Sequence, residues 1–329
     1  VIIESPDGNH LHLLGTYRNA AYSILNGTIT IPGPVPYGYP RYAFVALSLN
    51  SSTFSYIDHK IVSPTAHTYG NCEISLYEDV YVNSTEFAFI LELRDRYQNS
   101  WSSHRCYTYQ FDSGVSITTP TGTNNGGTST NFVIRANHSL DFIETTLISS
   151  KTKSGVDLDS VTTYNSPPIF LSDGGWARVK YNGDLNGPPL NTIYFSNRNG
   201  SISGSMSACA SGTNYLDLIS DGDGGFYHLC STFDSQNSTY NNSIMHYDIR
   251  NQSTDYLYLG QGDISPFGHI LPTSDRMLIS LDSPTTGLEL NNSNIYYGFF
   301  TLEINLTSEI ITRASNTLSH EFKSGPNLE

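Results

Sequence analysis

The chain has 329 residues, of which 38% are hydrophobic and only 14% are charged, and its net charge is −14. This acidity, with no cluster of Lys or Arg, argues against binding to nucleic acid and against an anionic membrane surface as partner. The 23 Tyr, 27 Gly and 15 Pro favour short β-strands joined by tight turns rather than long helices.

The first predicted element is a hairpin at residues 1–14, in which two apolar strands flank Ser5-Pro6-Asp7-Gly8. Asp accepts hydrogen bonds from nearby N–H groups and Gly adopts positive φ, so this phrase favours a turn. A second hairpin is predicted at 20–25 and 28–31, around Asn26-Gly27. Single apolar strands are then predicted at 42–49, 87–93 and 132–136.

The hairpin phrase returns three times in the second half of the chain. It reads PIFLSDGGWARV at 168–179, YLDLISDGDGGFYHL at 215–229 and HILPTSDRMLISL at 269–281. Third and fourth strands follow the last two copies, at 243–250 and 255–259 and at 296–306 and 309–313. Second strands then start near residues 10, 42, 87, 132, 176, 226 and 277.

Repeated units of four short antiparallel strands are typical of a β-propeller, because stacking each sheet against its neighbours buries both of its apolar faces. We therefore predict an all-β, seven-bladed propeller over residues 1–315, followed by a C-terminal tail at 316–329. The predicted blades span approximately residues 1–32, 33–66, 70–120, 126–163, 165–207, 213–260 and 264–315.

The repeated phrase resembles that of TolB/WD40-like propellers, which often carry Ser-Pro-Asp-Gly between the first two strands. Ser5-Pro6-Asp7-Gly8 matches in full. Ser172-Asp173-Gly174 and Ser220-Asp221-Gly222 lack the proline, and Ser274-Asp275 keeps only part. The Trp-Asp signature of true WD40 repeats is absent from the sequence. The resemblance implies the fold alone, since it transfers no catalytic or binding residue to this chain.

A second architecture also fits the sequence. Residues 118–130, TTPTGTNNGGTST, have the composition of a flexible linker. In this alternative the linker divides the chain into two β-sandwich-like domains. In the propeller it is a long loop between blades.

Ten N-x-[S/T] sequons, none with a central proline, indicate the compartment. Some arise by chance in a cytosolic chain rich in Asn, Ser and Thr, but ten along the whole length favour a secreted or cell-surface glycoprotein. We expect a processed mature chain or an extracellular portion with no direct membrane insertion. The predicted glycosylation sites are Asn26, Asn50, Asn83, Asn137, Asn199, Asn237, Asn241, Asn251, Asn291 and Asn305.

Four cysteines fit an oxidising compartment. The pairs Cys72–Cys106 and Cys209–Cys230 are local in sequence and are the simplest of three connectivities. No CxxC or Cys/His spacing indicates zinc. Each disulfide would stabilise the fold by about 2–4 kcal/mol, by restricting the unfolded chain.

Asp217, Asp221 and Asp223 alternate beside glycines in DLISDGDGG, an arrangement of carboxylates that suits calcium. The twelve-residue calcium loop with its terminal Glu is absent, so an ordinary turn between two strands is the competing interpretation. No other cofactor is predicted.

The sequence shows no nucleophile motif of the G-x-S-x-G type and no H-E-x-x-H, so no catalytic residue is assigned. We expect a non-enzymatic binding or structural glycoprotein, whose partner is a protein, a carbohydrate or another copy of the chain. One alternative is an extracellular glycoside hydrolase or lyase with carboxylates at the propeller channel. A second is a viral attachment-type head, although such heads usually carry more cysteines.

Overall fold

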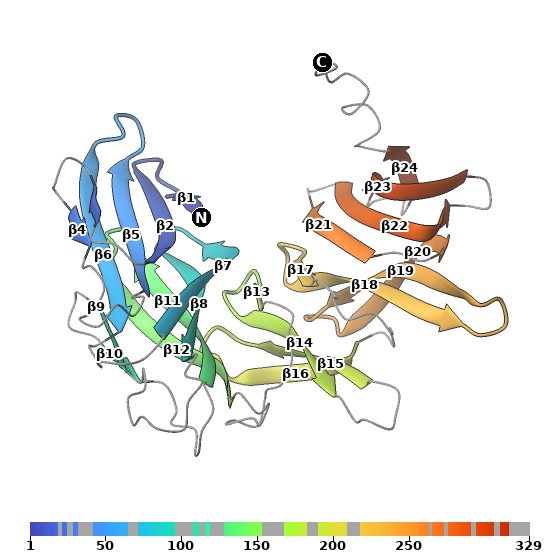
Figure 1. Cartoon of the computed structure of the whole chain (residues 1–329), viewed down its shortest axis with the longest axis horizontal. Coiled ribbons are helices and arrows are strands. Elements are labelled where there is room, and N and C mark those ends of the chain that lie inside the picture. Colours follow the sequence, from blue (N-terminus) through green and yellow to red (C-terminus); the bar gives the residue numbers. More distant parts are fainter. Residues whose placement is uncertain are drawn as a thin grey trace, which may run out of the picture. The chain divides into compact units, whose positions relative to one another are not determined.

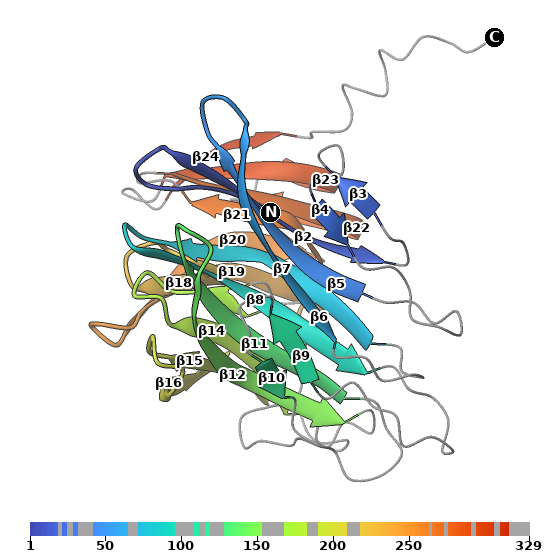
Figure 2. The same ribbon diagram turned by 90° about the vertical axis from the view of Figure 1, so that its left-hand side faces the viewer.

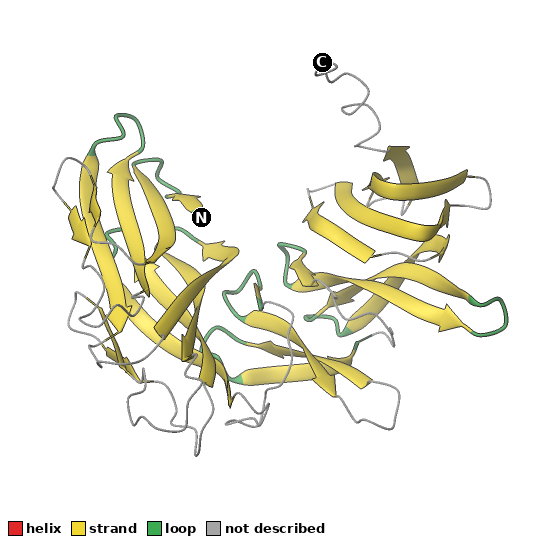
Figure 3. Ribbon diagram, in the orientation of Figure 1, coloured by secondary structure: helices red, strands yellow, loops and turns green. Residues whose placement is uncertain are grey.

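The computed structural model describes residues 1–18, 22–24, 29–31, 42–64, 72–95, 108–111, 116–118, 128–152, 168–182, 190–208, 218–262, 265–272, 276–290, 294–305 and 310–315. Within these ranges every regular element is a β-strand, β1 to β24, and none is a helix (Figure 1, Figure 3). The prediction of an all-β protein is therefore confirmed. The chain forms two compact units, Val1–Thr163 (unit 1) and Tyr164–Glu329 (unit 2).

Unit 1 contains two main antiparallel sheets, whose strands are drawn in colours from blue to green in Figure 2. The first has the order β1 (Ile2–Glu4), β2 (His10–Arg18), β5 (Tyr42–Asn50), β6 (Tyr56–Pro64), β9 (Thr108–Phe111) and β10 (Ser116–Thr118). The second has the order β12 (Phe142–Thr152), β11 (Thr128–Asn137), β8 (Glu86–Asp95) and β7 (Cys72–Val82). A separate hairpin pairs β3 (Tyr22–Ile24) with β4 (Ile29–Ile31).

The two main sheets of unit 1 share one apolar core. Phe44 of β5 and Phe89 of β8 are fully buried, and their rings stack with centroids 4.8 Å apart. Full burial of such a side chain stabilises the fold by roughly 1.5–3 kcal/mol. The same core contains Ile3, Leu14, Ala46, Val62, Ile74, Phe87, Leu91, Leu93, Ile117, Phe132, Ile134, Ala136 and Leu140.

Unit 2 begins with a sheet of four sequential strands, β13 (Ile169–Phe170), β14 (Trp176–Asn182), β15 (Leu190–Ser196) and β16 (Ile202–Ser207). Its second sheet runs through β17 (Leu218–Ser220), β18 (Gly225–Asp234), β19 (Thr239–Asp248), β20 (Ser253–Gly262), β22 (Arg276–Leu290), β23 (Asn294–Asn305) and β24 (Ile310–Ser315). Strand β21 (Ser265–Pro272) pairs with β22. Several four-stranded antiparallel groups therefore follow one another along the chain.

Strand β18 is buried on both of its faces. Phe226 and Cys230 point to one face and join a core with Ala177, Val179 and Ile193 of the β13–β16 sheet. Leu229 points to the other face and joins a core with Ile279 and Leu302 of β22 and β23. Successive strand residues alternate between faces, so one apolar strand supplies two cores at once.

The first predicted blade is wrong in its third and fourth strands. Strand β2 pairs with β5, with Leu13 opposite Leu47, while β3 and β4 pair only with each other among the described strands. The hairpin at 20–31 is thus present as predicted, although its Asn26-Gly27 turn lies outside the described residues. Alternation identifies a strand, but several equally apolar strands can serve as its partner.

The predicted equivalence of the strands at 87–93 and 132–136 is also wrong. These strands, β8 and β11, are neighbours in one sheet, with Ile90 opposite Val133. Between them the chain passes through β9 and β10, which belong to the other sheet of unit 1. Their spacing of about 45 residues therefore reflects an insertion within one sheet and not one repeat.

The alternative domain boundary at residues 118–130 is wrong for the same reason. Strand β11 begins inside this segment, yet it pairs along its length with β8, which precedes the segment. Ile134 of β11 packs in the same core as Phe44. The segment joins two parts of unit 1, because long-range strand pairing outweighs its linker-like composition.

The repeated Asp-Gly phrase forms the same kind of turn in three places. Gly8, Gly174 and Gly222 have φ values of 69°, 81° and 78°, a region that glycine enters without steric cost. In each turn the preceding Asp accepts a backbone N–H: Asp7 from Asn9 (3.0 Å), Asp173 from Gly175 (2.7 Å) and Asp221 from Gly225 (2.8 Å). The structural role predicted for the phrase is confirmed at these turns, and the copy at Ser274-Asp275 lies outside the described residues.

We expect Gly175→Ala to destabilise the protein by about 1–3 kcal/mol, because the new Cβ would collide with the backbone carbonyl oxygen of Ser196. Gly15→Ala is the matched control, since no atom lies within 4 Å of a Cβ at that strand position. Urea unfolding of both variants checks this. Equal free energies of unfolding would contradict the close packing of the turn on β15.

A row of aromatic rings lies at one end of unit 1. His12 is fully buried between the rings of Phe87 (4.8 Å), His10 (5.8 Å) and His138 (5.9 Å). Within the described part of the chain neither nitrogen of its ring has a hydrogen-bond partner. Burial, together with the charges of His138 and His10, lowers the pKa of His12 to about 4.

This buried histidine should make the fold sensitive to acid. In the unfolded chain His12 binds a proton below about pH 6.5, whereas in the fold it stays neutral down to about pH 4. The free energy of unfolding should therefore fall by about 3 kcal/mol across this interval on account of His12 alone. Urea titrations should show a correspondingly smaller acid loss for His12→Phe, and identical pH profiles for the two proteins would refute this.

Candidate functional site

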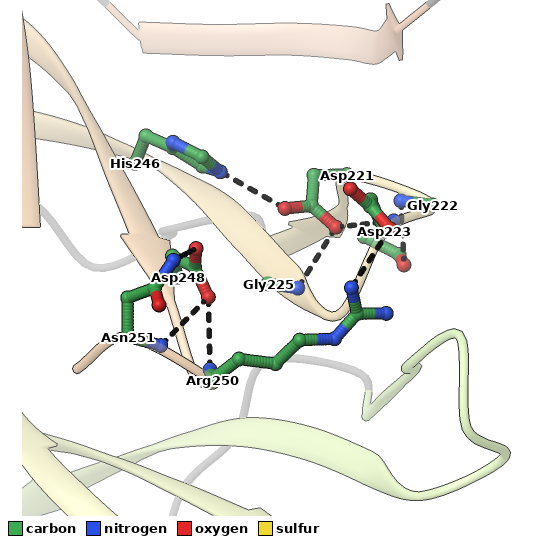
Figure 4. A network of polar contacts seen from close by, with 9 residues as sticks. Asp221, Gly222, Asp223, Gly225, His246, Asp248, Arg250 and Asn251 are labelled. Atoms are coloured by element: carbon green, nitrogen blue, oxygen red, sulfur yellow. Dashed lines mark hydrogen bonds and ion pairs between the residues drawn. The ribbon is translucent and has the colours of Figure 1, made fainter. Parts of the chain in front are cut away.

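The turn between β17 and β18 holds a connected set of polar groups (Figure 4). One carboxylate oxygen of Asp221 accepts hydrogen bonds from the backbone N–H groups of Asp223 (2.7 Å) and Gly225 (2.8 Å). The other carboxylate oxygen lies 2.9 Å from Nε2 of His246 on β19. A Cβ at Gly225 would collide with the carbonyl oxygen of Tyr247, so glycine is required where the turn meets β19.

Pairing of β18, β19 and β20 positions His246. It lies opposite Tyr227 on one neighbouring strand and opposite Asp255 on the other. Its ring stacks on that of Tyr227 with centroids 4.6 Å apart and an interplanar angle of 25°. The imidazole is thus fixed by a stacked phenol on one side and by a hydrogen-bonded carboxylate at Nε2.

The Asp221–His246 contact favours the charged forms of both groups. The hydrogen bond to Asp221 raises the pKa of His246 and outweighs burial, which acts in the opposite direction. Burial alone would raise the pKa of Asp221, but the hydrogen bonds from His246 and from the backbone lower it overall. Burial, and then the charge of Asp221, raises the pKa of Tyr227, which therefore keeps its proton at neutral pH.

Polar residues of the β17–β18 and β19–β20 turns lie next to this pair. Arg250 contacts Asp223 at 3.1 Å, and their side chains are 64% and 87% exposed, so this ion pair contributes less than about 1 kcal/mol. Asp248 accepts hydrogen bonds from the backbone N–H groups of Arg250 (2.8 Å) and Asn251 (3.1 Å) and from Nδ2 of Asn251 (2.6 Å). The Asp248 contacts close the β19–β20 turn, which lies next to the Asp221 turn (Figure 4).

A pocket of about 180 Å³ lies beside the Asp221–His246 pair. Its polar wall comes from β18, β19 and β20, and its apolar floor includes residues of β22 and β23. Tyr256 is 61% exposed at its edge. The lining residues are Tyr227, Ile244, His246, Asp255, Tyr256, Leu257, Met277 and Ile304.

The calcium candidates are placed differently from one another. Asp221 and Asp223 lie in the same turn, but Asp221 contacts His246 and backbone N–H donors, and Asp223 contacts Arg250. Asp217 lies outside the described residues. In the part of the chain that the structure describes, no group of three His, Cys, Asp or Glu side chains is arranged to hold a metal ion.

The predicted disulfides involve largely undescribed side chains. Cys230 is buried in unit 2 and is not a free thiol. The side chains of Cys72, Cys106 and Cys209 lie outside the described residues. The pairings Cys72–Cys106 and Cys209–Cys230 therefore stay predictions.

Most described sequons fall at hairpin turns. Asn241 is an exception, since it lies within β19 and pairs with Thr232 of β18 and Gln261 of β20. Asn26 and Asn291 lie outside the described residues. The sequons at or beside strand ends are Asn50, Asn83, Asn137, Asn199, Asn237, Asn251 and Asn305.

Sequence reasoning placed His246 on a strand and Asp221 in a turn, but did not bring them together. It gave Tyr227 and Asp255 no role. The 226–229 and 243–250 strands do show alternation, and the polar segment between them predicts a hairpin. The register of that hairpin, which puts Tyr227 opposite His246, follows from the turn geometry and not from the alternation.

The fold defines the class of protein: an all-β chain of several four-stranded antiparallel groups. No protein-family model and no curated protein matches the sequence. Among solved structures the chain is similar to the oligogalacturonate lyase of Vibrio parahaemolyticus, with 12% identity and a TM-score of 0.35, over 96% of this chain and 83% of the lyase. A likeness this low supports no inference about chemistry. In the described residues no helix is long and apolar enough to span a membrane.

Replacing Asp221 by Asn should lower the pKa of His246, because the largest contribution that raises it is lost. The titration of the His246 ring followed by NMR measures this directly. Asp223→Asn is the control, since Asp223 belongs to the same turn but contacts Arg250 instead. An unchanged His246 titration in Asp221→Asn would show that the 2.9 Å contact does not persist in solution.

Proposed function

We propose that the chain is an extracellular, N-glycosylated β-propeller protein that binds carbohydrate without reacting with it. The observation that carries the proposal is the pocket between the β18–β20 strands and the β22–β23 strands. There the stacked pair Tyr227–His246 and the carboxylate of Asp255, which share one face of the sheet, line one small cavity.

The chemistry of this lining suits a sugar. Aromatic rings offer flat apolar surfaces, and a carboxylate accepts hydrogen bonds from hydroxyl groups. The volume of about 180 Å³ is below the roughly 300–1,000 Å³ of sites for drug-sized ligands, which favours a single sugar unit of a larger glycan. The net charge of −14 and the carboxylates around the pocket favour a neutral sugar over a polyanionic one.

Two features favour binding over catalysis. A hydroxyl or thiol nucleophile activated by the histidine would be a Ser, Thr or Cys, and the described pocket lining contains none. Glycoside hydrolysis usually needs two carboxylates facing the ligand. Asp255 lines the pocket, but the carboxylate of Asp221 is engaged by His246 and the backbone of its turn.

The propeller part of the proposal draws on strand pairing and two-faced burial. Consecutive groups of four strands stack in unit 2, as β18 illustrates, and stacking of this kind closes a propeller when it continues around a ring. The pairings favour five blades over the seven in the sequence interpretation. In the described chain β9 and β10 extend the first sheet and β20 pairs with β22, so the four main sheets have six, four, four and eight strands. The five groups of four strands that we take as blades are β1-β2-β5-β6, β7-β8-β11-β12, β13-β14-β15-β16, β17-β18-β19-β20 and β21-β22-β23-β24.

The pocket is tested by screening the purified protein against an array of neutral and acidic oligosaccharides, followed by calorimetry on the best ligand. Asp255→Asn should weaken binding about tenfold, because it removes a charged hydrogen-bond acceptor. Tyr227→Ala should weaken binding several-fold through loss of the aromatic ring that lines the pocket.

Tyr258→Ala is the matched control. Tyr258 is a tyrosine of β20 that is 50% exposed on the face opposite to Asp255, and it is not among the described residues that line the pocket. Its affinity should equal that of the unmodified protein. Absence of any bound oligosaccharide, or equal losses for the two tyrosine variants, would overturn the proposed function.

A further inference from the structure

The sequons occupy equivalent positions in successive groups of four strands. Each of the five four-strand groups carries one at the turn between its third and fourth strands, or at the end of the third strand. The sequence spacing alone does not show this, because insertions separate the strands of the first two groups. The equivalent asparagines are Asn50 (β5–β6), Asn137 (β11–β12), Asn199 (β15–β16), Asn251 (β19–β20) and Asn305 (β23–β24).

These turns lie at the same end of the sheet as the turn between the first and second strands, because alternate turns of an antiparallel sheet emerge at the same end. In the first group Asn50 lies opposite His10, and the hydroxyl of Ser51 donates to the carbonyl oxygen of Gly8 in the Asp-Gly turn. The second group has the sequon Asn83 in place of an Asp-Gly turn, and His138 lies 2.9 Å from its carbonyl oxygen. The end of each sheet at which these turns lie is here called the Asp-Gly edge.

The side-chain oxygen of the asparagine caps the turn at three of these sites. Asn50 Oδ1 accepts the N–H groups of Ser52 (3.1 Å) and Thr53 (2.9 Å). Asn199 Oδ1 accepts the N–H (2.9 Å) and the hydroxyl (2.6 Å) of Ser201. Asn137 Oδ1 accepts the N–H of Ser139 at 2.9 Å. Nδ2 of Asn137 also donates to Asp141 at 3.2 Å, and a glycosylated amide keeps one N–H for such a bond. A substituent on Nδ2 therefore leaves the contacts of the side-chain oxygens intact.

At Asn251 the turn is capped differently. Asp248 accepts the backbone N–H groups, and Nδ2 of Asn251 donates one hydrogen bond to Asp248. A glycosylated amide keeps one N–H, so this donor survives modification. Asn199 and Asn251 are exposed, and Asn50, Asn137 and Asn305 are half-buried at the ends of strands.

We infer that the asparagines of the third-to-fourth-strand turns are N-glycosylation sites, and that their glycans cover the Asp-Gly edge of every sheet. In the reaction Nδ2 attacks C1 of a lipid-linked oligosaccharyl pyrophosphate. The C1–N bond forms, the C1–O bond breaks, the amide loses one proton and the lipid pyrophosphate departs. The inference rests on the extracellular location in the proposed function, but not on the sugar-binding pocket.

Asn241 is the contrasting sequon. It lies within β19, away from any turn, and its Oδ1 accepts a hydrogen bond from Gln261 of the adjacent strand at 3.1 Å. A glycan there would project from a hydrogen-bonded strand rather than from a sheet edge. Asn241 is therefore not assigned as a site.

Glycopeptide mapping of the protein from its natural source tests the assignment. Enzymatic release of N-glycans in H₂¹⁸O converts each occupied asparagine to labelled aspartate. We expect label at Asn50, Asn137, Asn199, Asn251 and Asn305, and none at Asn241. Absence of label at these turns, or equal label at Asn241, would overturn the inference.

Asparagine could also recur at these turns only because its side chain caps the turn. Substitution by Asp separates this explanation from N-glycosylation. Expressed through a eukaryotic secretory pathway, Asn50→Asp and Asn199→Asp should each lose the mass of one glycan. Asp keeps the capping oxygen, so the melting temperature should stay within about 2 °C.

Asn197→Asp is the matched control. Asn197 lies in the same turn and accepts the hydroxyl of Ser201 at 2.9 Å, but it does not begin a sequon. Its glycan mass should be unchanged. Unchanged mass in all three variants would mean that these asparagines only cap turns, and this result does not depend on sugar binding by the pocket. If the glycans are present but the pocket binds no sugar, the proposed function alone is overturned.

Discussion

The structure depends on burial of both faces of its four-stranded sheets. A short antiparallel sheet with two apolar faces is unstable in water by itself, and β18 shows how unit 2 resolves this. Phe226 and Cys230 pack on the β13–β16 sheet, and Leu229 packs on β22 and β23. In unit 2 each of these sheets is therefore stabilised by strands that cover it.

The same constraint fixes the turns. Sheets that pack on their neighbours bury much of their strand surface, so many polar contacts of the chain lie in hairpin turns. The Asp-Gly turns repeat because an Asp acceptor and a glycine with positive φ close a hairpin within few residues. At Asp221 the turn gains a second role, because the carboxylate that closes it also holds His246 beside the pocket.

The proposed binding pocket and one proposed glycosylation site both involve the β17–β20 group. The Asp221–His246 pair, the pocket and the Asn251 turn all belong to the β17–β20 group or lie against it. A glycan-covered edge and a sugar-binding pocket are compatible, since the pocket is lined by strand residues and by the facing strands β22 and β23. The two proposals nevertheless stand on different residues and fail independently.

The sequence by itself determined the all-β class, the Asp-Gly turns and the position of many of the described strands, because alternation and turn residues act over a few neighbouring positions. It gave no strand at the positions of β6, β7, β9, β10, β12, β15 and β16. It did not determine which strands pair: β2 with β5 and β8 with β11 are contacts between distant, equally apolar segments. Only the tertiary structure placed Tyr227, His246 and Asp255 around one pocket, because register across three strands decides which side chains meet. The sequons were visible from the start, but their shared edge required the pairing as well.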